Sequence, residues 1–521
     1  MQLFTTCLLF LAPSIRAAPT PLQALIDAAI STGAPSLTLP PNGTFQQGDA
    51  PLVLTATDFL LDANGARIIF APGAGVVIEQ SQRVEFRNAT VSYDPPSFTQ
   101  GSVIAFDAVA RTIDLKLDAG FAAPDAPFFT TVEVKMQFFD NATRARSLPQ
   151  SGCCLVSVAG PAAAGAYRFK LDAGGCKCVV PPLPGLLATV SPRVNGFDYQ
   201  IPGGYVGGGW WVFNSSRVVT RAVTLLGSGN FAFSEWGGDG AHLYDGIVLA
   251  RDENNGHLLS SNTDGFHTFA VGAGPTITRA SLSWMGDDVA NFHNRVGIVL
   301  STATIPNGAL AAIIIDVGDT PTPRLDPTNP SRAFAFARVG DVLKISSPSG
   351  TPRGAAPDGA FTLTASLDWS VNSSIIAAAR AAIAARPGVA VDPRGIGAWQ
   401  AVFDAPGSDV VPGDVVQFDR YAGANALVED STFTDAYDTC FRLQSRGAVV
   451  MNNTWARTSG GIEIGYDPEW LEGASDIANI VIDGNTFRAV GYPPKTTIEE
   501  VISVQKNVLN VSQSNNVVLP E

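Results

Sequence analysis

The chain has 521 residues, of which 46% are hydrophobic and only 15% are charged, and its net charge is −14. This length allows a large core, and the low charge together with 51 glycines suits an all-β protein with many tight turns. The acidic balance argues against nucleic acid or an anionic membrane surface as a partner and, more weakly, against a polyanionic substrate.

Residues 1–18 combine a short apolar run with a small-residue end at Ala17-Ala18. This pattern predicts a secretory signal peptide and therefore a secreted, extracellular protein. No later run reaches the ~18 apolar residues of a membrane span, so we expect no transmembrane segment. Sequons for N-glycosylation agree with secretion and occur at Asn42, Asn88, Asn141, Asn214, Asn372, Asn452 and Asn510.

Residues 19–100 are expected to form the first coils of a β-solenoid. Residues 21–30 carry apolar side chains at helical spacing, and short strand-like segments separated by Gly, Pro and Asn follow them. A short helix leading into such strands covers the open N-terminal edge of a solenoid. We therefore predict an N-terminal cap helix.

Two segments interrupt this pattern. Strands over residues 101–200 lengthen and alternate more clearly, which predicts an inserted β-barrel or β-sandwich, and residues 301–415 predict a second inserted β-subdomain. Closely spaced cysteines in the first insertion allow two local disulfides, with a metal site of four thiolates as the less favoured alternative; they are Cys153, Cys154, Cys176 and Cys178. Cys440 is left over and is expected to be a buried free thiol.

Solenoid coils are expected again over residues 201–300 and 416–521. In the last segment Phe433, Trp455 and Phe487 follow repeated strand-to-turn signatures, and the first two are 22 residues apart (455 − 433). Stacked repeats have periods of roughly 20–50 residues, whereas a β-sandwich places strands about every 8–12 residues. The spacing favours the solenoid.

The sharpest chemical signal is a set of three aspartates, Asp264, Asp287 and Asp288. Asp264 and Asp287 are 23 positions apart (287 − 264), about one coil, so the three carboxylates should share one wall. Three close like charges cannot all ionise cheaply, so one of them can act as an acid. An aspartate beside glycine is otherwise often a turn residue. Clustered carboxylates on a rigid wall suit acid/base hydrolysis of a glycosidic bond, provided that the chain bends at Gly286 so that both paired aspartates face a cleft.

Three histidines recur at the same interval: His242, His267 and His293 are 25 and 26 residues apart (267 − 242; 293 − 267). Such a stack could bind a metal, but we favour a polar ladder that binds sugar hydroxyls or orients the aspartates, and we expect neither a metal nor a cofactor. Aromatic rings that could stack on a sugar and charged residues on neighbouring coils complete the candidate substrate site: Trp236, Trp284, Arg442 and Glu463.

The order Asn262-Thr263-Asp264 followed by Gly286-Asp287-Asp288 resembles the polygalacturonases, which are inverting pectinase-type β-helix hydrolases with three catalytic aspartates. The chain lacks the later Gly-His-Gly and Arg-Ile-Lys motifs of that family. It also has no lysine between Lys177 and Lys344, which is poor provision for binding a galacturonate carboxylate.

The chain is more similar to the α-1,3-galactosidases that remove the terminal galactose of the blood-group B antigen. Their pattern of Asp-Gly-hydrophobic-His, then Asp-Asp-x-x-Asn-hydrophobic-His one coil later, is matched by residues 264–267 and 287–293, and adds Asn291 to the candidate substrate site. The segment 468–473 also resembles this family. Strong matches are confined to about 240–300 and 430–490. The resemblance implies an inverting exo-glycosidase on a right-handed parallel β-helix interrupted by barrel-like domains.

The expected function is therefore hydrolysis of terminal α-linked galactose, with an α-1,3 linkage favoured. By analogy with the polygalacturonases, Asp287 would be the acid, and Asp264 with Asp288 the bases. Two alternatives stay open: a polygalacturonase-like pectin hydrolase, and a non-catalytic β-helix protein that binds glycans. A lyase is less favoured because a basic residue must abstract the α-proton, and residues 262–293 offer mainly aspartates.

Overall fold

In the computed structural model the described residues run from 21 to 519, with gaps at 127–128, 130–132, 148–153, 163–164, 172–182, 194–207, 294–295, 305–309, 318–338, 348–350, 352, 354–359, 365–376, 379–380, 383–395, 405–408, 438–440, 468–471, 474–476, 493 and 507. The predicted signal peptide, the free-thiol prediction for Cys440 and the disulfide predictions for Cys153, Cys176 and Cys178 lie outside the described residues. The backbone of Cys154 begins a strand, but its side chain is also outside them.

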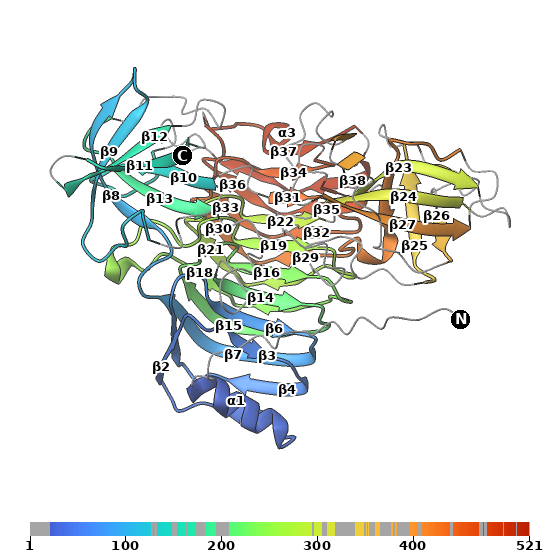
Figure 1. The fold of residues 1–521 in the computed structure, drawn as a ribbon, viewed down its shortest axis with the longest axis horizontal. Helices are drawn as coiled ribbons and strands as arrows, with labels where there is room; N and C mark the ends of the chain where they lie inside the picture. Colours follow the sequence, from blue (N-terminus) through green and yellow to red (C-terminus); the bar gives the residue numbers. More distant parts are fainter. Residues whose placement is uncertain are drawn as a thin grey trace, which may run out of the picture.

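The core of the molecule is a parallel β-helix, as expected from the sequence (Figure 1). A typical coil contributes two strands to a first parallel sheet and one strand to a second parallel sheet. The second sheet contains β3 (Leu52–Leu54), β6 (Gly75–Glu79), β14 (Gly209–Phe213), β16 (Phe233–Trp236), β19 (Phe266–Phe269), β22 (Ala290–His293), β31 (Phe441–Leu443), β34 (Ile462–Ile464) and β37 (Ile502–Val504).

The first sheet contains β1 (Ser36–Thr38), β2 (Thr44–Gly48), β4 (Thr57–Asp62), β5 (Arg67–Phe70), β7 (Gln82–Tyr93), β15 (Val219–Leu226), β17 (Leu243–Asp245), β18 (Val248–Leu249), β20 (Thr276–Thr278), β21 (Ser281–Ser283), β29 (Leu427–Glu429), β30 (Thr432–Thr434), β32 (Val449–Met451), β33 (Thr454–Ala456), β35 (Ala478–Asp483), β36 (Thr486–Arg488), β38 (Leu509–Ser514) and β39 (Val517–Leu519).

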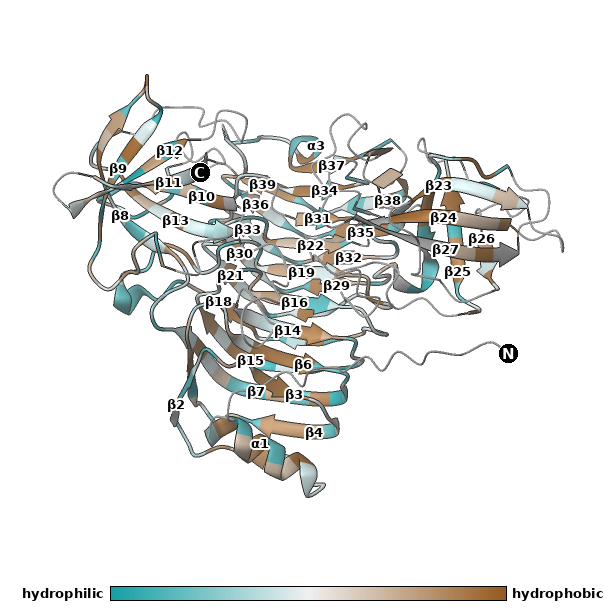
Figure 2. Ribbon diagram, viewed as in Figure 1, coloured by the Kyte–Doolittle hydropathy of each residue, from teal (hydrophilic) through white to brown (hydrophobic). Residues whose placement is uncertain are grey.

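The register of the coils follows the repeat seen in the sequence. Phe433 pairs with Trp455, and Trp455 pairs with Phe487, so these side chains form one stack inside the coil. Along the second sheet, alternate residues point inward and fill the same core with rings: Trp210, Phe233, Phe266, Phe292 and Phe441. Figure 2 shows hydrophobic segments, in brown, along the strands of the coils. Burying these rings supplies the main driving force for stacking the coils.

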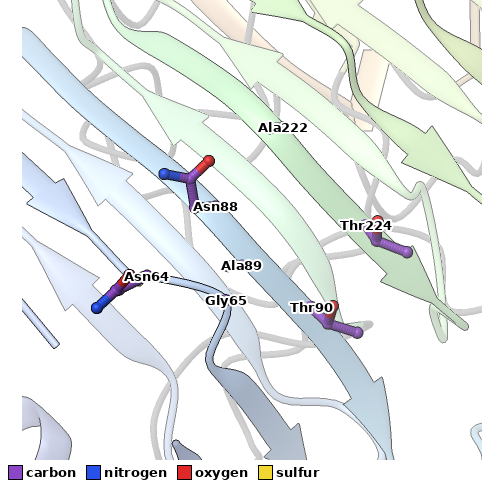
Figure 3. A pocket seen from close by; sticks show the side chains of 7 residues that line it. All are labelled: Asn64, Gly65, Asn88, Ala89, Thr90, Ala222 and Thr224. Carbon is purple, nitrogen blue, oxygen red and sulfur yellow. The ribbon is translucent and has the colours of Figure 1, made fainter. Parts of the chain in front are cut away.

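Each of these coils bends within the first sheet at a residue with positive φ. The bend residues are Asn42, Asn64, Asn88, Ala222, Gly246, Arg279, Asp430, Asn452, Gly484 and Asn515. Asn and Gly tolerate this left-handed conformation best, which explains why they recur at this position. A shallow open depression lies over the bends at Asn64, Asn88 and Ala222 and is also lined by Thr90 and Thr224 (Figure 3). It lies on the first sheet, away from the aspartates described below.

The expected cap helix is α1 (Pro21–Ser31), which buries Leu22 and Ile26 in the same core. Gln23 completes the cap because its side chain pairs with the backbone of β3. Its Nε2 donates to Val53 O, and its Oε1 accepts from Val53 N, both at 2.8 Å. The side chain thus satisfies backbone groups that the first strand of the second sheet would otherwise present at an open edge.

Two closed antiparallel barrels interrupt the coils. The first barrel contains β8 (Thr99–Asp107), β9 (Thr112–Leu117), β10 (Glu133–Phe139), β11 (Cys154–Pro161), β12 (Tyr167–Leu171) and β13 (Leu187–Arg193). The second barrel contains β23 (Gly297–Thr304), β24 (Leu310–Val317), β25 (Val342–Ser346), β26 (Ala360–Leu363), β27 (Ile396–Asp404) and β28 (Val415–Phe418).

The barrels flank the second sheet from opposite ends (Figure 1). The first barrel precedes β14 and therefore lies at the N-terminal ends of the strands of the second sheet, whereas the second barrel follows β22 and lies at the C-terminal ends. Short helical segments complete the described part: η3 (Glu253–Asn255), η5 (Asp419–Tyr421) and α3 (Ile498–Val501). Among the described helices, none has the length and apolar character needed to cross a membrane.

Candidate active site

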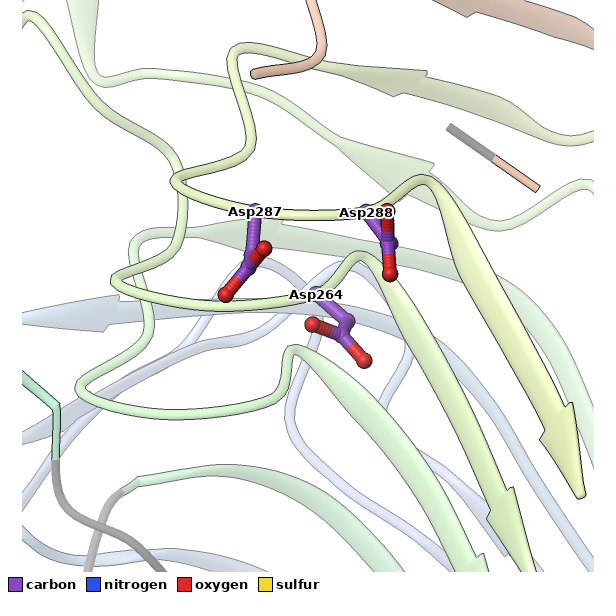
Figure 4. A group of neighbouring side chains, drawn as sticks. All are labelled: Asp264, Asp287 and Asp288. Carbon is purple, nitrogen blue, oxygen red and sulfur yellow. The ribbon is translucent and has the colours of Figure 1, made fainter. Parts of the chain in front are cut away.

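Three aspartates meet at the N-terminal ends of two neighbouring strands. Asp264 lies two residues before β19, and Asp287 and Asp288 lie in the bend before β22. Phe266 pairs with Ala290, and Gly265 N donates to Asp288 O at 2.9 Å, so the two loops stack one coil apart. One carboxylate oxygen from each aspartate lies within 4.8 Å of the others, and all three residues are buried (Figure 4).

The motif residues around the aspartates hold these loops in place. A Cβ atom at Gly286 would lie 2.5 Å from Asn262 O, so only glycine allows this close approach of successive coils. Asn262 Nδ2 donates to Ser97 O at 2.9 Å, and Thr263 Oγ1 donates to Asn230 Oδ1 at 3.1 Å. The Asn-Thr-Asp and Gly-Asp-Asp motifs therefore set the shape of the loops as well as supplying the carboxylates.

A chain of two histidines extends from Asp264 along the outer face of the second sheet. His267 Nδ1 lies 2.8 Å from Asp264 Oδ2, and His267 Nε2 lies 2.9 Å from His293 Nε2. A hydrogen bond between two ring nitrogens needs one hydrogen, so one histidine donates and the other accepts. Phe231 stacks on His267 with the ring centroids 3.9 Å apart and fixes the orientation of the imidazole.

Asp287 contacts a lysine from the first barrel. Lys135 Nζ lies 2.5 Å from Asp287 Oδ2, and both side chains are buried. Val134, Met136 and Phe138 of β10 point into the barrel core, so the alternate residues Lys135 and Gln137 face the β-helix. Gln137 Nε2 also donates to Gly286 O at 2.7 Å. One face of β10 therefore contacts the loop that carries Asp287 directly.

A second cation from the first barrel lies beside the same loop. Arg146 donates to Met285 O at 2.7 Å and to Asp435 O at 2.9 Å, and its guanidinium lies over the Tyr437 ring. Burial lowers the pKa of Arg146 to about 10, while the nearby negative charges of Asp435 and Asp287 act in the opposite direction. At neutral pH Arg146 therefore remains a cation next to Asp287.

Asp288 faces an arginine from the next coil. Arg442 Nε lies 3.1 Å from Asp288 Oδ2, and the same guanidinium contacts Asp467. The neighbouring residue of the sheet, Asn291, donates to Glu472 Oε2 at 3.0 Å, and Glu472 Oε1 lies 3.8 Å from His293 Nε2. Residues that precede the second barrel in sequence and residues that follow it thus meet at the site.

Oxygen donors within 4.8 Å of one another have the composition of a site for a divalent cation. Lys135 and Arg442, however, lie against two of the three carboxylates and neutralise them. The residues therefore do not fit a metal ion, and the arrangement is that of three carboxylates balanced by protein cations and a histidine.

The histidine ladder expected from the sequence has two members in this structure. Gly240 bridges to Ala273 and Leu243 pairs with Thr276, which puts His242 level with Pro275, outside the second sheet. His242 Nδ1 accepts from Val218 N at 3.0 Å, and burial lowers the pKa of His242 to about 3. A spacing of one coil does not fix register when the turns differ in length, so the structure gives His242 a buried structural role.

Trp236 is enclosed by protein, and Trp284 is partly buried. Trp236 is 0% exposed and packs on Trp211 and His267, so neither face of its ring is open to a sugar. Trp284 lies in an apolar cluster at the first barrel, with Arg251 stacked 3.9 Å above its ring. Glu463 pairs in register with Arg442 and is partly exposed on the outer face of the sheet. The structure thus gathers Asp264, Asp287, Asp288, His267, His293, Asn291 and Arg442 around one point.

Sequence reasoning missed Lys135, Gln137 and Arg146, which lie about 120 residues or more before Asp264. The alternation of β10 was visible, but a lysine on the outer face of a barrel usually points into solvent. Glu472 lies within the recognised segment 468–473, but no role followed from its position in the sequence.

Neither a protein-family model nor a curated protein matches this sequence. Among solved structures, the catalytic domain of a GH87 α-1,3-glucanase in complex with tetrasaccharides is 7% identical with a TM-score of 0.33, and the match covers 96% of this chain and 57% of that one. The A-module of the Azotobacter vinelandii mannuronan C-5 epimerase AlgE4 is 8% identical with a TM-score of 0.25, covering 96% and 92%. The Agl-KA catalytic domain is 9% identical with a TM-score of 0.31, covering 96% and 65%.

The chain thus spans less than two thirds of the length of the first of these structures. At such identities and TM-scores the similarity carries no argument about chemistry. The functional argument therefore depends on the residues of the site itself.

Proposed function

We propose that this protein is a glycoside hydrolase that releases terminal α-linked galactose, with an α-1,3 linkage favoured. The observation that carries the proposal is the set of three buried carboxylates within 4.8 Å of one another on two stacked loops. Hydrolysis of a glycosidic bond needs one carboxylic acid to protonate the leaving oxygen and one carboxylate to act on water or on the anomeric carbon. Asp264, Asp287 and Asp288 supply these groups on rigid elements.

The charges of the site support a neutral sugar. Lys135 and Arg442 lie against Asp287 and Asp288, so both cations are already paired with carboxylates of the protein. A uronate would have to compete with these aspartates for the same cations, whereas a neutral hexose would not. The net charge of −14 acts in the same direction by repelling polyanionic chains.

The reaction would proceed by inversion. A water oxygen attacks the anomeric carbon as the bond to the leaving oxygen breaks, an aspartic acid protonates that oxygen, and a carboxylate takes the proton of the water. Inverting pairs are separated by ~6.5–9.5 Å and retaining pairs by ~5–5.5 Å. The 4.8 Å limit joins nearest oxygens, a shorter measure than the carboxyl separation of those ranges, so inversion stays a prediction based on the resemblance.

A panel of substrates tests the proposal. The protein is incubated with chromogenic α-galactoside, with a B-type trisaccharide that has a terminal α-1,3-galactose, and with polygalacturonate, and the released sugars are identified by chromatography. We expect free galactose from the first two and no galacturonate. Release of galacturonate alone would establish the pectin-type alternative, and binding of the trisaccharide without turnover would establish the glycan-binding alternative.

A further inference from the structure

The first barrel contributes charge to the catalytic centre, and this distinguishes the three aspartates from one another. Lys135 Nζ lies 2.5 Å from Asp287 Oδ2, in surroundings where the lysine side chain is 2% exposed and the aspartate side chain 7%. A buried charge is stable only when it is paired, so each member of this pair favours the ionised form of the other.

Charged groups from the first barrel and from the stacked loops lie around Asp287. Lys135 of β10 and Arg146 of the following loop face it from the barrel, and Asp264 and Asp288 face it from the stacked loops. Tyr437 N donates to the backbone oxygen of Asp287 at 3.2 Å. Two cations therefore oppose the two neighbouring carboxylates at this position.

Asp264 contacts a histidine, whereas Asp287 and Asp288 contact a lysine and an arginine. Asp288 lies against the permanent cation Arg442, whereas Asp264 lies against His267, a side chain type that exchanges protons near neutral pH. His267 can therefore both give a proton to Asp264 and receive one from it, which the paired cations Lys135 and Arg442 do not do near neutral pH. The Asp264–His267 pair can hold the single proton that a general acid must carry into the reaction.

We infer that Lys135 is a positioning residue of the active site that keeps Asp287 ionised, so that Asp287 acts as the base and the proton for the leaving oxygen is held by Asp264 with His267. This inference rests on the proposed glycosidase function, and it differs from the assignment by analogy, in which Asp287 is the acid. It also makes the first barrel part of the catalytic machinery.

The pH dependence of kcat/KM separates the two assignments, because its acid limb reports the essential base and its alkaline limb reports the essential acid. Lys135→Met removes the charge at similar length. We expect the acid limb to move to higher pH by about one to three units, since an adjacent opposite charge favours a carboxylate by about that much. Activity at a pH below the shifted limb should fall by roughly tenfold for each unit of movement.

Matched variants complete the experiment. Lys135→Arg keeps the charge and should leave the acid limb near its wild-type position, and Lys170→Met makes the same change on the exposed face of β12 and should leave the whole profile unchanged. Movement of the alkaline limb in Lys135→Met would overturn the inference in favour of Asp287 as acid. A fall in kcat with neither limb moved would reduce Lys135 to a structural residue.

A measurement of stability tests the coupling of Lys135 and Asp287 without an activity assay. At neutral pH, Lys135→Met and Asp287→Asn should each lower the unfolding temperature, and the double variant should be no less stable than the worse single variant, because the pair is lost once. Additive losses would show that the two side chains are not coupled and would overturn the inference. Inactive wild-type protein with a coupled pair would instead count against the proposed function alone.

Discussion

The two barrels flank the same sheet but attach to it by different chemistry. The second barrel shares one apolar cluster with the outer face of the second sheet, in which Trp211 and Phe269 of the sheet pack with Ile314 and Leu343 of the barrel. The first barrel has an apolar contact through Phe139 as well, but it adds Lys135, Gln137 and Arg146 at the aspartate loops.

The difference shows that position in the coil determines what an insertion can do. The N-terminal ends of the sheet strands carry the aspartates, so an insertion at that end can supply counter-ions to them. The C-terminal ends carry rings such as Trp236 and Phe269, so an insertion there can cover apolar surface. We therefore expect changes in the first barrel to affect catalysis and changes in the second to affect stability.

The largest effect is expected at the aspartates. Asp264→Asn, Asp287→Asn and Asp288→Asn should each lower kcat/KM by about 10²–10⁴-fold, because in the proposed reaction each aspartate transfers a proton or stabilises charge in the transition state. Steady-state kinetics and circular dichroism check activity and folding together. Asp49→Asn, on an exposed turn, is the matched control. Wild-type rates in all three variants would show that these aspartates do not form the active site.

The contrast between the barrels is tested by Ile314→Ala in the apolar cluster of the second barrel. Ile314 is fully buried, so its truncation should lower the free energy of unfolding by about 2–5 kcal/mol while the activity per folded molecule stays near that of the wild type. Chemical denaturation with parallel assays measures both. Val109→Ala, at a 97% exposed position, should change neither. Loss of activity without loss of stability in Ile314→Ala would contradict the different roles assigned to the two barrels.

A pH effect on stability is expected from Glu235, which points into the core beneath the site. Burial raises the pKa of this carboxyl well above its ordinary 4.5, while Tyr244 donates to it at 3.4 Å. The folded protein holds this proton more tightly than the unfolded chain, so its stabilisation is present below pH 4.5 and is lost as pH rises, by about 1.4 kcal/mol per unit.

Glu235→Gln should therefore gain stability relative to the wild type as pH rises above 4.5, and the two proteins should respond alike to pH below it. Thermal unfolding over a pH series measures the difference in stability between Glu235→Gln and the wild type, with Glu499→Gln at an exposed position as the control. A difference that is independent of pH would mean that Glu235 is charged in the folded protein.

His242 gives an effect of opposite sign. Its pKa is lowered from 6.5 to about 3 by burial, so the folded protein binds this proton less well than the unfolded chain does. The contribution of His242 to stability is fully present above pH 6.5 and is lost as the pH falls toward 3, by about 1.4 kcal/mol per pH unit. His242→Asn keeps an acceptor for Val218 N and should flatten this dependence in thermal unfolding between pH 4 and 6.5. An unchanged slope would contradict the burial of a neutral ring.

The sequence was sufficient for those features that repeat from coil to coil. The spacing of Phe433 and Trp455 predicted the β-helix, and the spacing of Asp264 and Asp287 placed the carboxylates on stacked loops. Contacts between separate folding units could not be found this way. Lys135 reaches Asp287 because the first barrel packs against the β-helix. The alternation of residues in β10 predicts an outer face but does not predict what that face contacts.

The roles of residues within one coil were harder to predict for a related reason. His242 shares the interval of His267 and His293, but its register is set by the lengths of the turns between strands. Trp236 was expected to offer a ring face, yet Trp211 and His267 enclose it, which depends on rings from neighbouring coils.

The configuration of the first sugar released tests the central claim most directly. A B-type trisaccharide with terminal α-1,3-linked galactose is mixed with wild-type protein, and the anomeric proton of the product is followed by NMR before mutarotation, with Asp287→Asn in a parallel tube. We predict that β-galactose forms first and that the variant forms almost none. First appearance of α-galactose would contradict inversion, and equal release by the variant would contradict the three-aspartate site.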